Sequence, residues 1–340
     1  MSRRRCLRAS ALAVMLPMLL QGSAGASETA TTARSRPLQI VDLGTLPGGD
    51  SSSAEAINDD GWVVGWAAAG NGQTHGFVWR DGRMTDLGTL TGPTGYSGAY
   101  DVNERGEIVG DSSTATGGST AVLWHRGRMT DLGTLGGSFG KATGINDRGD
   151  VVGLSTTPTE DYHAFLWRDG RMTDLGTIAG ESSSSAEAIN DRGQVVGASG
   201  GPAVWRRGVP TRLPLVPGAE FGSAHDNNSR GDAVGYSGFL SGSSVNRAVI
   251  WRRGVPTDLG LQGGVSQAHG INDRGQVVGS REFVPSESFA GFLWEDGRVT
   301  TLPSLTGHGG YATAINNHGT IAGISPSPTN DFTSHAVLWH

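Results

Sequence analysis

One motif recurs seven times along this chain, and this recurrence restricts the possible folds more than any other feature. In each copy an alanine stands four residues before an asparagine, and glycines follow the asparagine three and seven residues later. The asparagines are Asn58, Asn103, Asn146, Asn190, Asn228, Asn272 and Asn316, at spacings of 45, 43, 44, 38, 44 and 44 residues. A period of about 44 residues is typical of β-propellers, in which each repeat forms one four-stranded blade.

Two further markers recur with the same period. A tryptophan ends an Ala-Phe-Leu-Trp-like segment at Trp79, Trp124, Trp167, Trp205, Trp251, Trp294 and Trp339. A leucine of an Asp-Leu-Gly-like segment occurs at Leu43, Leu87, Leu132, Leu175, Leu213, Leu259 and Leu302. In the third repeat the pattern predicts strands over residues 142–146, 150–154, 164–167 and 171–175. Short turns containing Asp and Gly join them in pairs, as in tight hairpins.

The order of the markers predicts how the blades close into a ring. The repeat region opens on the leucine marker, at residues 38–43, and ends on the tryptophan marker, at Trp339. The first segment therefore supplies the outer strand that the last repeat lacks, and pairing the two removes open sheet edges. We expect an all-β fold, a seven-bladed β-propeller over residues 38–340, closed by an N-terminal strand.

The first 37 residues precede the repeats. Residues 1–26 are typical of an export signal, with four arginines, an apolar run of about ten residues and the small-residue sequence Ala24-Gly25-Ala26. The sequence is compatible with both the general secretory and the twin-arginine routes. The apolar run is too short to span a membrane, which takes about 20 residues. Residues 27–37 are predicted to form a flexible linker, and the protein is predicted to be secreted.

Composition excludes several classes of protein. Gly accounts for 55 of 340 residues and charged residues for 17%, which excludes a helical bundle and a membrane transporter. Without the four arginines of the signal, 22 basic residues face 32 acidic ones, a formal charge of −10 that disfavours nucleic-acid binding. The only cysteine, Cys6, lies within the signal, so the mature chain is predicted to have no disulfide.

Several segments resemble a known family. His163-Ala164-Phe165-Leu166-Trp167, with the similar segments that end at Trp79 and Trp339, resembles the HAF repeat of predicted extracellular bacterial proteins. The flanking Asp-Leu-Gly-Thr and Ile-Asn-Asp-x-Gly-x-Val-Val-Gly segments are similar to its consensus. The resemblance covers residues 38–340. It implies export and repetition, and it carries no activity.

Residues present in all seven repeats are expected to serve the scaffold. The asparagines suit tight turns, in which the side-chain carbonyl accepts hydrogen bonds from backbone amides, and the tryptophans are expected to pack between blades. Binding residues are expected where the copies differ, on loops at one face of the ring. Aromatic rings beside carboxylates suit sugars, although the aromatic residues could instead plug the mouth of the ring. The candidate binding residues are Tyr96, Tyr100, Phe139, Glu160, Asp161, Tyr162, Phe221, His225, Asp226 and Tyr311.

No catalytic or metal-binding motif is present in the sequence. We therefore expect a monomeric, non-catalytic protein without cofactor or metal, acting as a binding or scaffold module for extracellular or cell-surface glycan. Two alternatives remain open at this stage. One is a hydrolase or lyase that acts on a polysaccharide in the central channel, and the other is a module that binds a protein at the cell surface.

Overall fold

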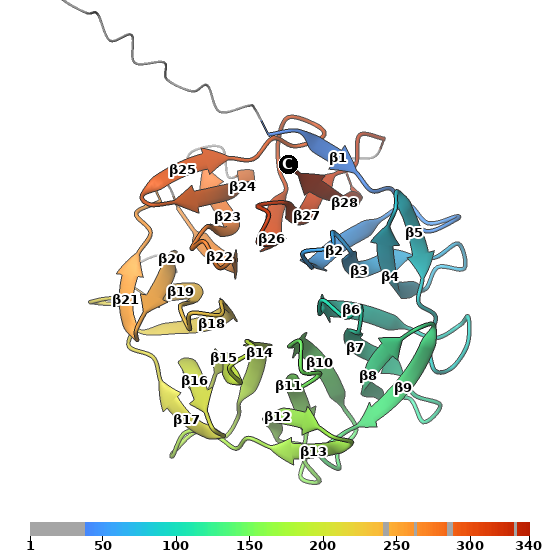
Figure 1. The fold of residues 1–340 in the computed structure, drawn as a ribbon, viewed down its shortest axis with the longest axis horizontal. Helices are drawn as coiled ribbons and strands as arrows, with labels where there is room; N and C mark the ends of the chain where they lie inside the picture. The colour runs from blue at the N-terminus through green and yellow to red at the C-terminus, as the bar shows by residue number, and fades with distance from the viewer. Residues whose placement is uncertain (1–37, 241–244, 262–263, 284–287, 330–331) are drawn as a thin grey trace, which may run out of the picture. The chain divides into compact units, whose positions relative to one another are not determined.

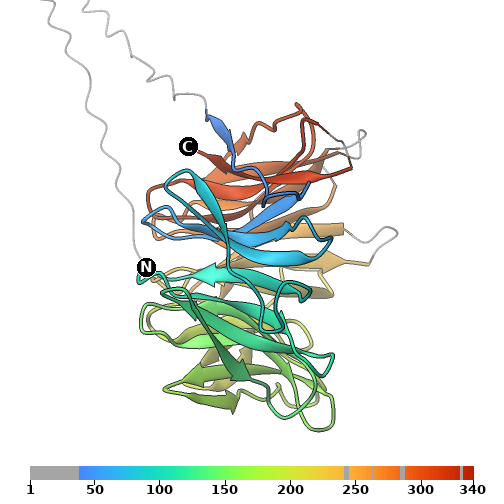
Figure 2. The ribbon, with the colours of Figure 1, turned by 90° about the vertical axis from the view of Figure 1, so that its right-hand side faces the viewer.

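The fold is a seven-bladed β-propeller, as the repeats predict. The computed structural model describes residues 38–240, 245–261, 264–283, 288–329 and 332–340. These residues form strands β1 to β28 and no helix. The strands make seven four-stranded antiparallel sheets around a central channel (Figure 1), and Figure 2 shows the ring from its edge. The predicted signal and linker, residues 1–37, lie outside the described residues.

Each blade is a meander that runs from the channel outward. The innermost strands are β2 (Ser52–Ile57), β6 (Ser97–Val102), β10 (Gly140–Ile145), β14 (Ser185–Ile189), β18 (Phe221–Asn227), β22 (Ser266–Ile271) and β26 (Tyr311–Ile315). The second strands are β3 (Val63–Ala68), β7 (Ile108–Ser113), β11 (Val151–Thr156), β15 (Gln194–Ala198), β19 (Ala233–Phe239), β23 (Val277–Phe283) and β27 (Ile321–Pro326).

The outer two strands complete each sheet. The third strands are β4 (Thr74–Arg80), β8 (Ser119–His125), β12 (Tyr162–Arg168), β16 (Pro202–Arg206), β20 (Val245–Arg252), β24 (Ser288–Glu295) and β28 (Ser334–Trp339). The outermost strands are β5 (Arg83–Asp86), β9 (Arg128–Gly133), β13 (Arg171–Asp174), β17 (Val209–Arg212), β21 (Val255–Asp258), β25 (Arg298–Thr301) and β1 (Ile40–Asp42).

The first strand closes the ring, which confirms the prediction from the marker order. Strand β1 pairs with β28 in the order β1-β28-β27-β26, and blue β1 lies beside red β28 in Figure 1. Reciprocal backbone hydrogen bonds join Gln39 and His340 at 2.9 and 3.1 Å. Leu43 and Leu46, just beyond β1, are only 7% and 2% exposed and pack against the first and last blades.

Each hydrophobic cluster is built from two neighbouring blades. Val234, Ala248 and Ile250 of one blade, for example, pack against Phe292 and Trp294 of the next. Four of the repeat tryptophans also donate an indole hydrogen bond to a carbonyl of the preceding blade, at 2.6 to 3.2 Å. These are Trp124 to Leu87, Trp205 to Leu175, Trp251 to Pro214 and Trp339 to Pro303. The prediction that the tryptophans pack between blades is confirmed.

The glycine seven residues after each asparagine is required by a close approach of two strands. In the third blade, a Cβ on Gly153 would lie well inside van der Waals contact with the carbonyl oxygen of Lys141. The same clash with the innermost strand would arise at Gly65, Gly110, Gly197, Gly235, Gly279 and Gly323. The innermost strand can approach this closely only where the second strand has no side chain.

The repeat asparagines make the predicted turns and also join the blades. In blade 4, Asn190 Oδ1 accepts hydrogen bonds from the amides of Arg192 and Gln194, at 3.1 and 3.0 Å. Its Nδ2 donates to the carbonyl of Asn228 in blade 5 at 2.9 Å. All seven asparagines donate in this way to the next one, and Asn316 returns to Asn58 at 3.0 Å. The sequence predicts the turn but gives no sign of this closed circle of seven hydrogen bonds.

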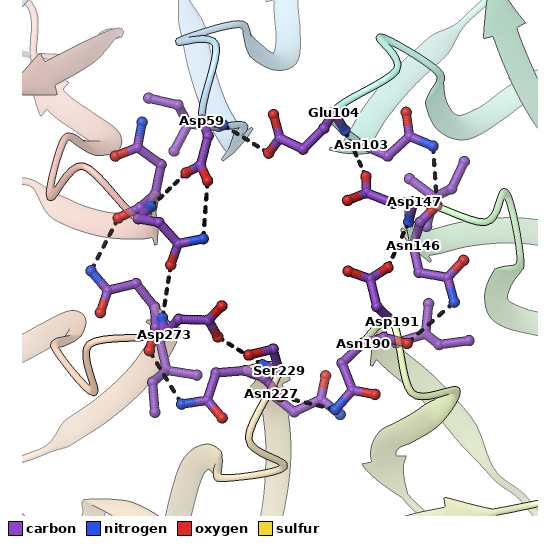
Figure 3. Close-up of a pocket in the computed structure, with 18 of the residues that line it drawn as sticks. Asp59, Asn103, Glu104, Asn146, Asp147, Asn190, Asp191, Asn227, Ser229 and Asp273 are labelled. Carbon is purple, nitrogen blue, oxygen red and sulfur yellow. Dashed lines mark hydrogen bonds between the residues drawn. The ribbon is translucent and has the colours of Figure 1, made fainter.

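A second circle of hydrogen bonds surrounds the same mouth of the channel (Figure 3). In six of the seven blades, the residue after the asparagine accepts a hydrogen bond from the backbone amide of the equivalent residue in the preceding blade. Glu104 accepts from Asp59 at 2.9 Å, for example, and Asn317 accepts from Asp273 at 2.8 Å. The circle is interrupted after Asp191, because the next blade has the shorter Ser229 at this position, and among the described residues no acceptor meets the Asp191 amide.

We expect Ser229→Asn to close this gap and to raise the free energy of unfolding by about 0.5–1.5 kcal/mol, the net contribution of one hydrogen bond. Asparagine serves this position in blade 7 and adds no charge to a mouth that carries five carboxylates. The measurement is the urea midpoint, with Ser229→Ala as the control that removes the hydroxyl without supplying an acceptor. Equal midpoints for the two variants would contradict the expectation.

Candidate functional site

A β-bulge in every innermost strand turns one variable residue into the central channel. The ladder between the first two strands shifts by one residue immediately after the repeat alanine in all seven blades. Such a bulge re-aims the side chain at the extra residue. The residues at this position are Glu55, Tyr100, Thr143, Glu187, His225, His269 and Thr313, all of which line the channel. The scaffold is therefore regular, whereas the channel wall is not.

The channel contains open space beside these residues. One cavity of about 230 Å³ lies against the variable ring, and a second of about 480 Å³ also reaches Trp66 and Lys141. The two cavities share Glu55, Tyr100 and His225 among their lining residues. The aromatic side chains therefore leave open space inside the channel.

A continuous row of five rings runs through blades 5 to 7, and two of them, His225 and His269, line the channel. Phe221 contacts Tyr236, and Tyr236 contacts His225, with ring centroids 6.2 and 5.5 Å apart. His225 then contacts His269 at 5.8 Å, and His269 contacts Tyr311 at 6.0 Å. Most of these contacts are edge-to-face, a favourable arrangement for aromatic pairs. We call these five residues the aromatic row.

The blades on the other side contribute polar groups. The hydroxyls of Tyr96 and Tyr100 are 2.8 Å apart, and the Lys141 ammonium lies 3.7 Å from the centroid of the Tyr100 ring. Asp111 lies close to both tyrosines, and its charge raises the pKa of each hydroxyl beyond the effect of burial. The two tyrosines therefore remain neutral hydrogen-bonding groups.

Two carboxylates face the same space as Lys141. Glu55 accepts hydrogen bonds from Ser53 Oγ at 2.8 Å and from Trp66 Nε1 at 2.9 Å. Glu187 accepts one from Ser185 Oγ at 2.9 Å. Burial raises the pKa of both side chains, while their serine partners and the charge of Lys141 oppose that rise. Both carboxylates keep further acceptor capacity toward the cavity, because each is bonded through one oxygen only.

Two deeper carboxylates connect blades. Asp101 accepts hydrogen bonds from the amides of Val102 and Ile145, and Asp226 accepts from Asn227 and Ile271, all at 2.7 to 2.8 Å. Burial raises the pKa of Asp101 to about 6 and that of Asp226 to about 7, and the charge of Asp101 adds to the second shift. Since each joins its own blade to the next, these groups serve the scaffold.

The histidines of the aromatic row are held neutral. Burial lowers the pKa of His269 to about 4 and also lowers that of His225. Each ring bonds through Nδ1 to the carbonyl of the repeat alanine in the next blade, at 3.0 Å. Because a carbonyl oxygen only accepts hydrogen bonds, Nδ1 is the donor at each ring. The row therefore presents uncharged rings to the channel.

Three of the ten candidate residues line the channel, and three more are connected to its lining through side-chain contacts. Tyr100, His225 and Asp226 line a cavity directly. Tyr96 reaches it through its bond to Tyr100, and Phe221 and Tyr311 form the two ends of the aromatic row.

The other four candidates, Phe139, Glu160, Asp161 and Tyr162, do not line the channel cavities. Phe139 packs edge-to-face on Tyr162 of the third strand, with ring centroids 5.9 Å apart. Glu160 accepts hydrogen bonds from the backbone amide and hydroxyl of Ser138, and Asp161 accepts one from Thr159. These contacts stabilise the loops of blade 3. Tyr162 begins the third strand of that blade, which lies outward from the channel.

Sequence reasoning missed Glu55, Trp66, Lys141, Glu187, Tyr236 and His269. A signal for four of them was available. Glu55, Glu187 and His269 follow the repeat alanine directly and Lys141 precedes it directly, at positions that differ between copies of an otherwise regular strand.

Comparisons with known proteins support the fold alone. No protein-family model matches the sequence, and no curated protein is significantly similar to it. A solved structure, the β-propeller domain of the Trilobed protease from Pyrococcus furiosus, described as having an open velcro topology, matches with a TM-score of 0.55 at 12% identity. That match covers 85% of this chain and 96% of the other.

Two weaker matches are enzymes. A gluconolactonase, XC5397 from Xanthomonas campestris, has a TM-score of 0.44 at 10% identity and covers 89% of both chains. A puromycin-hydrolysing peptidase from Mycobacterium tuberculosis has a TM-score of 0.45 at 12% identity, with 82% of this chain and 58% of that chain covered. These similarities identify no activity for this protein.

The described residues contain neither a cluster of potential metal ligands nor a helix that could span a membrane. No three His, Cys, Asp or Glu side chains in that part of the chain gather closely enough to hold a metal ion. Within the same residues, no helix is long and apolar enough to cross a membrane.

Proposed function

We propose that this protein is a secreted, non-catalytic binding module whose site for extracellular or cell-surface glycan is the central channel. The observation that carries the proposal is that His225 and His269 of the aromatic row line open space together with Glu55 and Glu187, and Lys141 lines the adjoining cavity. Sugar rings have apolar faces that pack on aromatic side chains and hydroxyls that exchange hydrogen bonds with carboxylates and ammonium groups. Export is proposed from residues 1–26 and from the resemblance to the HAF repeat.

The size and chemistry of the space suit a short glycan segment. Cavities of about 230 and 480 Å³ are comparable with small-molecule sites, which typically have apolar walls and a few well-placed polar groups. Glu55 and Glu187 offer acceptors, Lys141 offers donors, and the tyrosine hydroxyls offer both. A neutral, hydroxyl-rich ligand would use all of these groups.

A thermal-shift screen of residues 27–340 against soluble oligosaccharides and polysaccharides tests the proposal. A ligand at about 100 times its Kd adds about 2.7 kcal/mol of stability, which raises the melting temperature by several degrees. We expect Tyr311→Ala to weaken binding about tenfold, through the loss of about 1.4 kcal/mol of ring contact.

Tyr162→Ala provides the matched control. Tyr162 and Tyr311 are 48% and 38% exposed, but only Tyr311 belongs to the aromatic row. A glycan whose binding is weakened by Tyr311→Ala and retained in Tyr162→Ala supports the channel site. Equal binding by both variants, or no shift with any glycan, would contradict it.

One observation favours a polysaccharide hydrolase or lyase as the second candidate. Glu55 and Glu187 line the same cavity and have raised pKa values, as acid–base groups of glycosidases do. Incubation of the bound glycan with wild type and with Glu55→Gln, followed by reducing-end analysis, separates the two functions. Release of new ends by wild type alone would identify an enzyme, whereas a binding module leaves the glycan intact.

The structure offers less for the third candidate, a protein-binding surface. The exposed large apolar side chains, among them Leu90, Val209 and Phe289, belong to different blades. Single exposed apolar residues are normal on soluble proteins.

A further inference from the structure

A further cavity lies away from the channel, in the cleft between blades 1 and 2. Its volume is about 450 Å³, and we call it the interblade cleft. Trp62 and Arg80 line it from blade 1, and Trp124 and Arg126 line it from blade 2. It shares no lining residue with the two channel cavities, which both include Glu55, Glu187 and His225.

The cleft arises at a position where blade 1 departs from the repeat. Four residues after the repeat asparagine, the other blades have the polar residues Glu107, Asp150, Gln194, Asp232, Gln276 and Thr320. In blade 3 this residue bonds to the neighbouring third strand, with Asp150 Oδ1 2.6 Å from Arg168 Nε. Blade 1 has Trp62 instead, and the Arg80 guanidinium lies 4.5 Å from its ring centroid. An ion pair of the repeat is thus replaced by a cation–π contact.

The indole of Trp62 occupies space that the next blade leaves free. A Cβ on Gly106 would lie 2.7 Å from the Trp62 ring, so the ring rests directly on the backbone of that turn. Val78, Ile108 and Trp124 continue the apolar wall. The Trp124 indole N–H is already bonded to the carbonyl of Leu87, whereas among the described residues no acceptor meets Trp62 Nε1.

The charge of the cleft is opposite to that of the whole chain. Within the described residues, neither Arg80 nor Arg126 forms an ion pair. Arg105 also lines the cleft but is neutralised by Glu107, with Nη2 and Oε2 2.5 Å apart. Asp86, the one carboxylate of the lining, is bonded to His75 at 2.8 Å. Two unpaired guanidinium groups therefore face an apolar wall, in a chain with a formal net charge of −6.

We propose that the interblade cleft binds a carboxylate carried on a six-membered ring. Guanidinium groups match carboxylates in charge and in planar geometry, and the indole and aliphatic wall accommodates the body of the ring. Two kinds of compound share this chemistry, an uronic acid and an aromatic acid. The proposal rests on residues of the cleft only and does not depend on glycan binding in the channel.

The test uses D-galacturonate and benzoate as probes, with methyl galactoside and benzyl alcohol as their uncharged counterparts. Ligand-observed NMR at neutral pH and low salt measures binding to residues 27–340. We expect one of the two acids to bind and its uncharged counterpart to bind at least about tenfold more weakly, and the acid that binds identifies the kind of ligand. Binding of neither acid at tens of millimolar, or equal binding of acid and counterpart, would overturn the proposal.

Variants taken from other blades locate the site. Arg126→Asp introduces the residue of blade 3, where Asp169 occupies this turn position, and Trp62→Gln introduces the residue of blades 4 and 6. Each is expected to weaken acid binding about tenfold, from the loss of one charge-assisted bond or of the stacking surface. Arg207→Asp makes the same charge change at the equivalent turn of blade 4, and Glu187→Gln alters the channel alone. Both should leave acid binding unchanged, and a loss equal to that in Arg126→Asp would refute the assignment to this cleft.

Discussion

Deletion of residues 37–46 is expected to lower the free energy of unfolding by about 4 kcal/mol or more. The deletion removes β1, and with it the buried side chains of Leu43 and Leu46. Each fully buried leucine contributes about 1.5–3 kcal/mol, and exposure of the cavity walls adds to this loss. The edge of β28 would also lose its pairing partner and become open to other chains. Urea unfolding followed by tryptophan fluorescence measures the effect.

Two point variants make this result specific. Leu46→Ala removes one buried side chain and leaves β1 in place, so we expect a loss of about 2–4 kcal/mol. Gln39→Ala alters an exposed side chain whose backbone bonds to His340 remain, and it should change stability by less than about 0.5 kcal/mol. An unchanged melting temperature after deletion of residues 37–46 would mean that β1 does not close the ring.

The ring and its closure could be predicted because they follow from periodicity alone. Seven copies of three markers set the number of blades, and the absence of a tryptophan segment before Leu43 shows which strand is shared. In the third repeat the strands deviate from the predicted bounds by one or two residues at most ends. Tight turns fix the ends near Asn146 and Gly170, whereas β10 and β12 begin two residues earlier than predicted, at Gly140 and Tyr162.

The channel could be predicted only in part, because distance from the axis is not encoded in chain order. Phe139 and Tyr96 both precede the repeat alanine by three residues, yet Tyr96 turns inward to Tyr100 and Phe139 turns outward to Tyr162. The bulge after each alanine is equally hidden, since the sequence shows an alternating strand and the extra residue appears only in the pairing. His269 and Tyr311 meet because neighbouring blades place them side by side, although 42 residues separate them.

The circle of asparagines is the clearest case of a visible pattern with a hidden role. A turn explains the constant spacing within one repeat, because Asn190 Oδ1 caps the amides of Arg192 and Gln194. It does not explain the amide group, since aspartate forms such turns equally well. The donor is needed for the carbonyl of Asn228 in the next blade, which no single repeat contains.

Asn190→Ala is therefore expected to lower the free energy of unfolding by about 2–4 kcal/mol. The side chain is 6% exposed and makes three hydrogen bonds, and its removal leaves two backbone amides and one carbonyl without these partners. Asn190→Asp distinguishes the turn from the contact between blades. It keeps the acceptor for the two amides but places a second oxygen against the Asn228 carbonyl. If the turn were the whole role, this variant would be nearly as stable as wild type.

The pH dependence of the Asn190→Asp variant gives the sharper test. Its new carboxyl group can donate to the Asn228 carbonyl when protonated, whereas the ionised form cannot, so the folded state favours the proton and raises the pKa of this group. A raised pKa in the folded state contributes stability that is complete below the unfolded value and is lost as pH rises through the folded value. Relative to wild type, Asn190→Asp should thus regain stability between neutral pH and about pH 4, and Asn190→Ala should not. Parallel pH profiles of the two variants, measured by urea unfolding, would show that the amide does not join the blades.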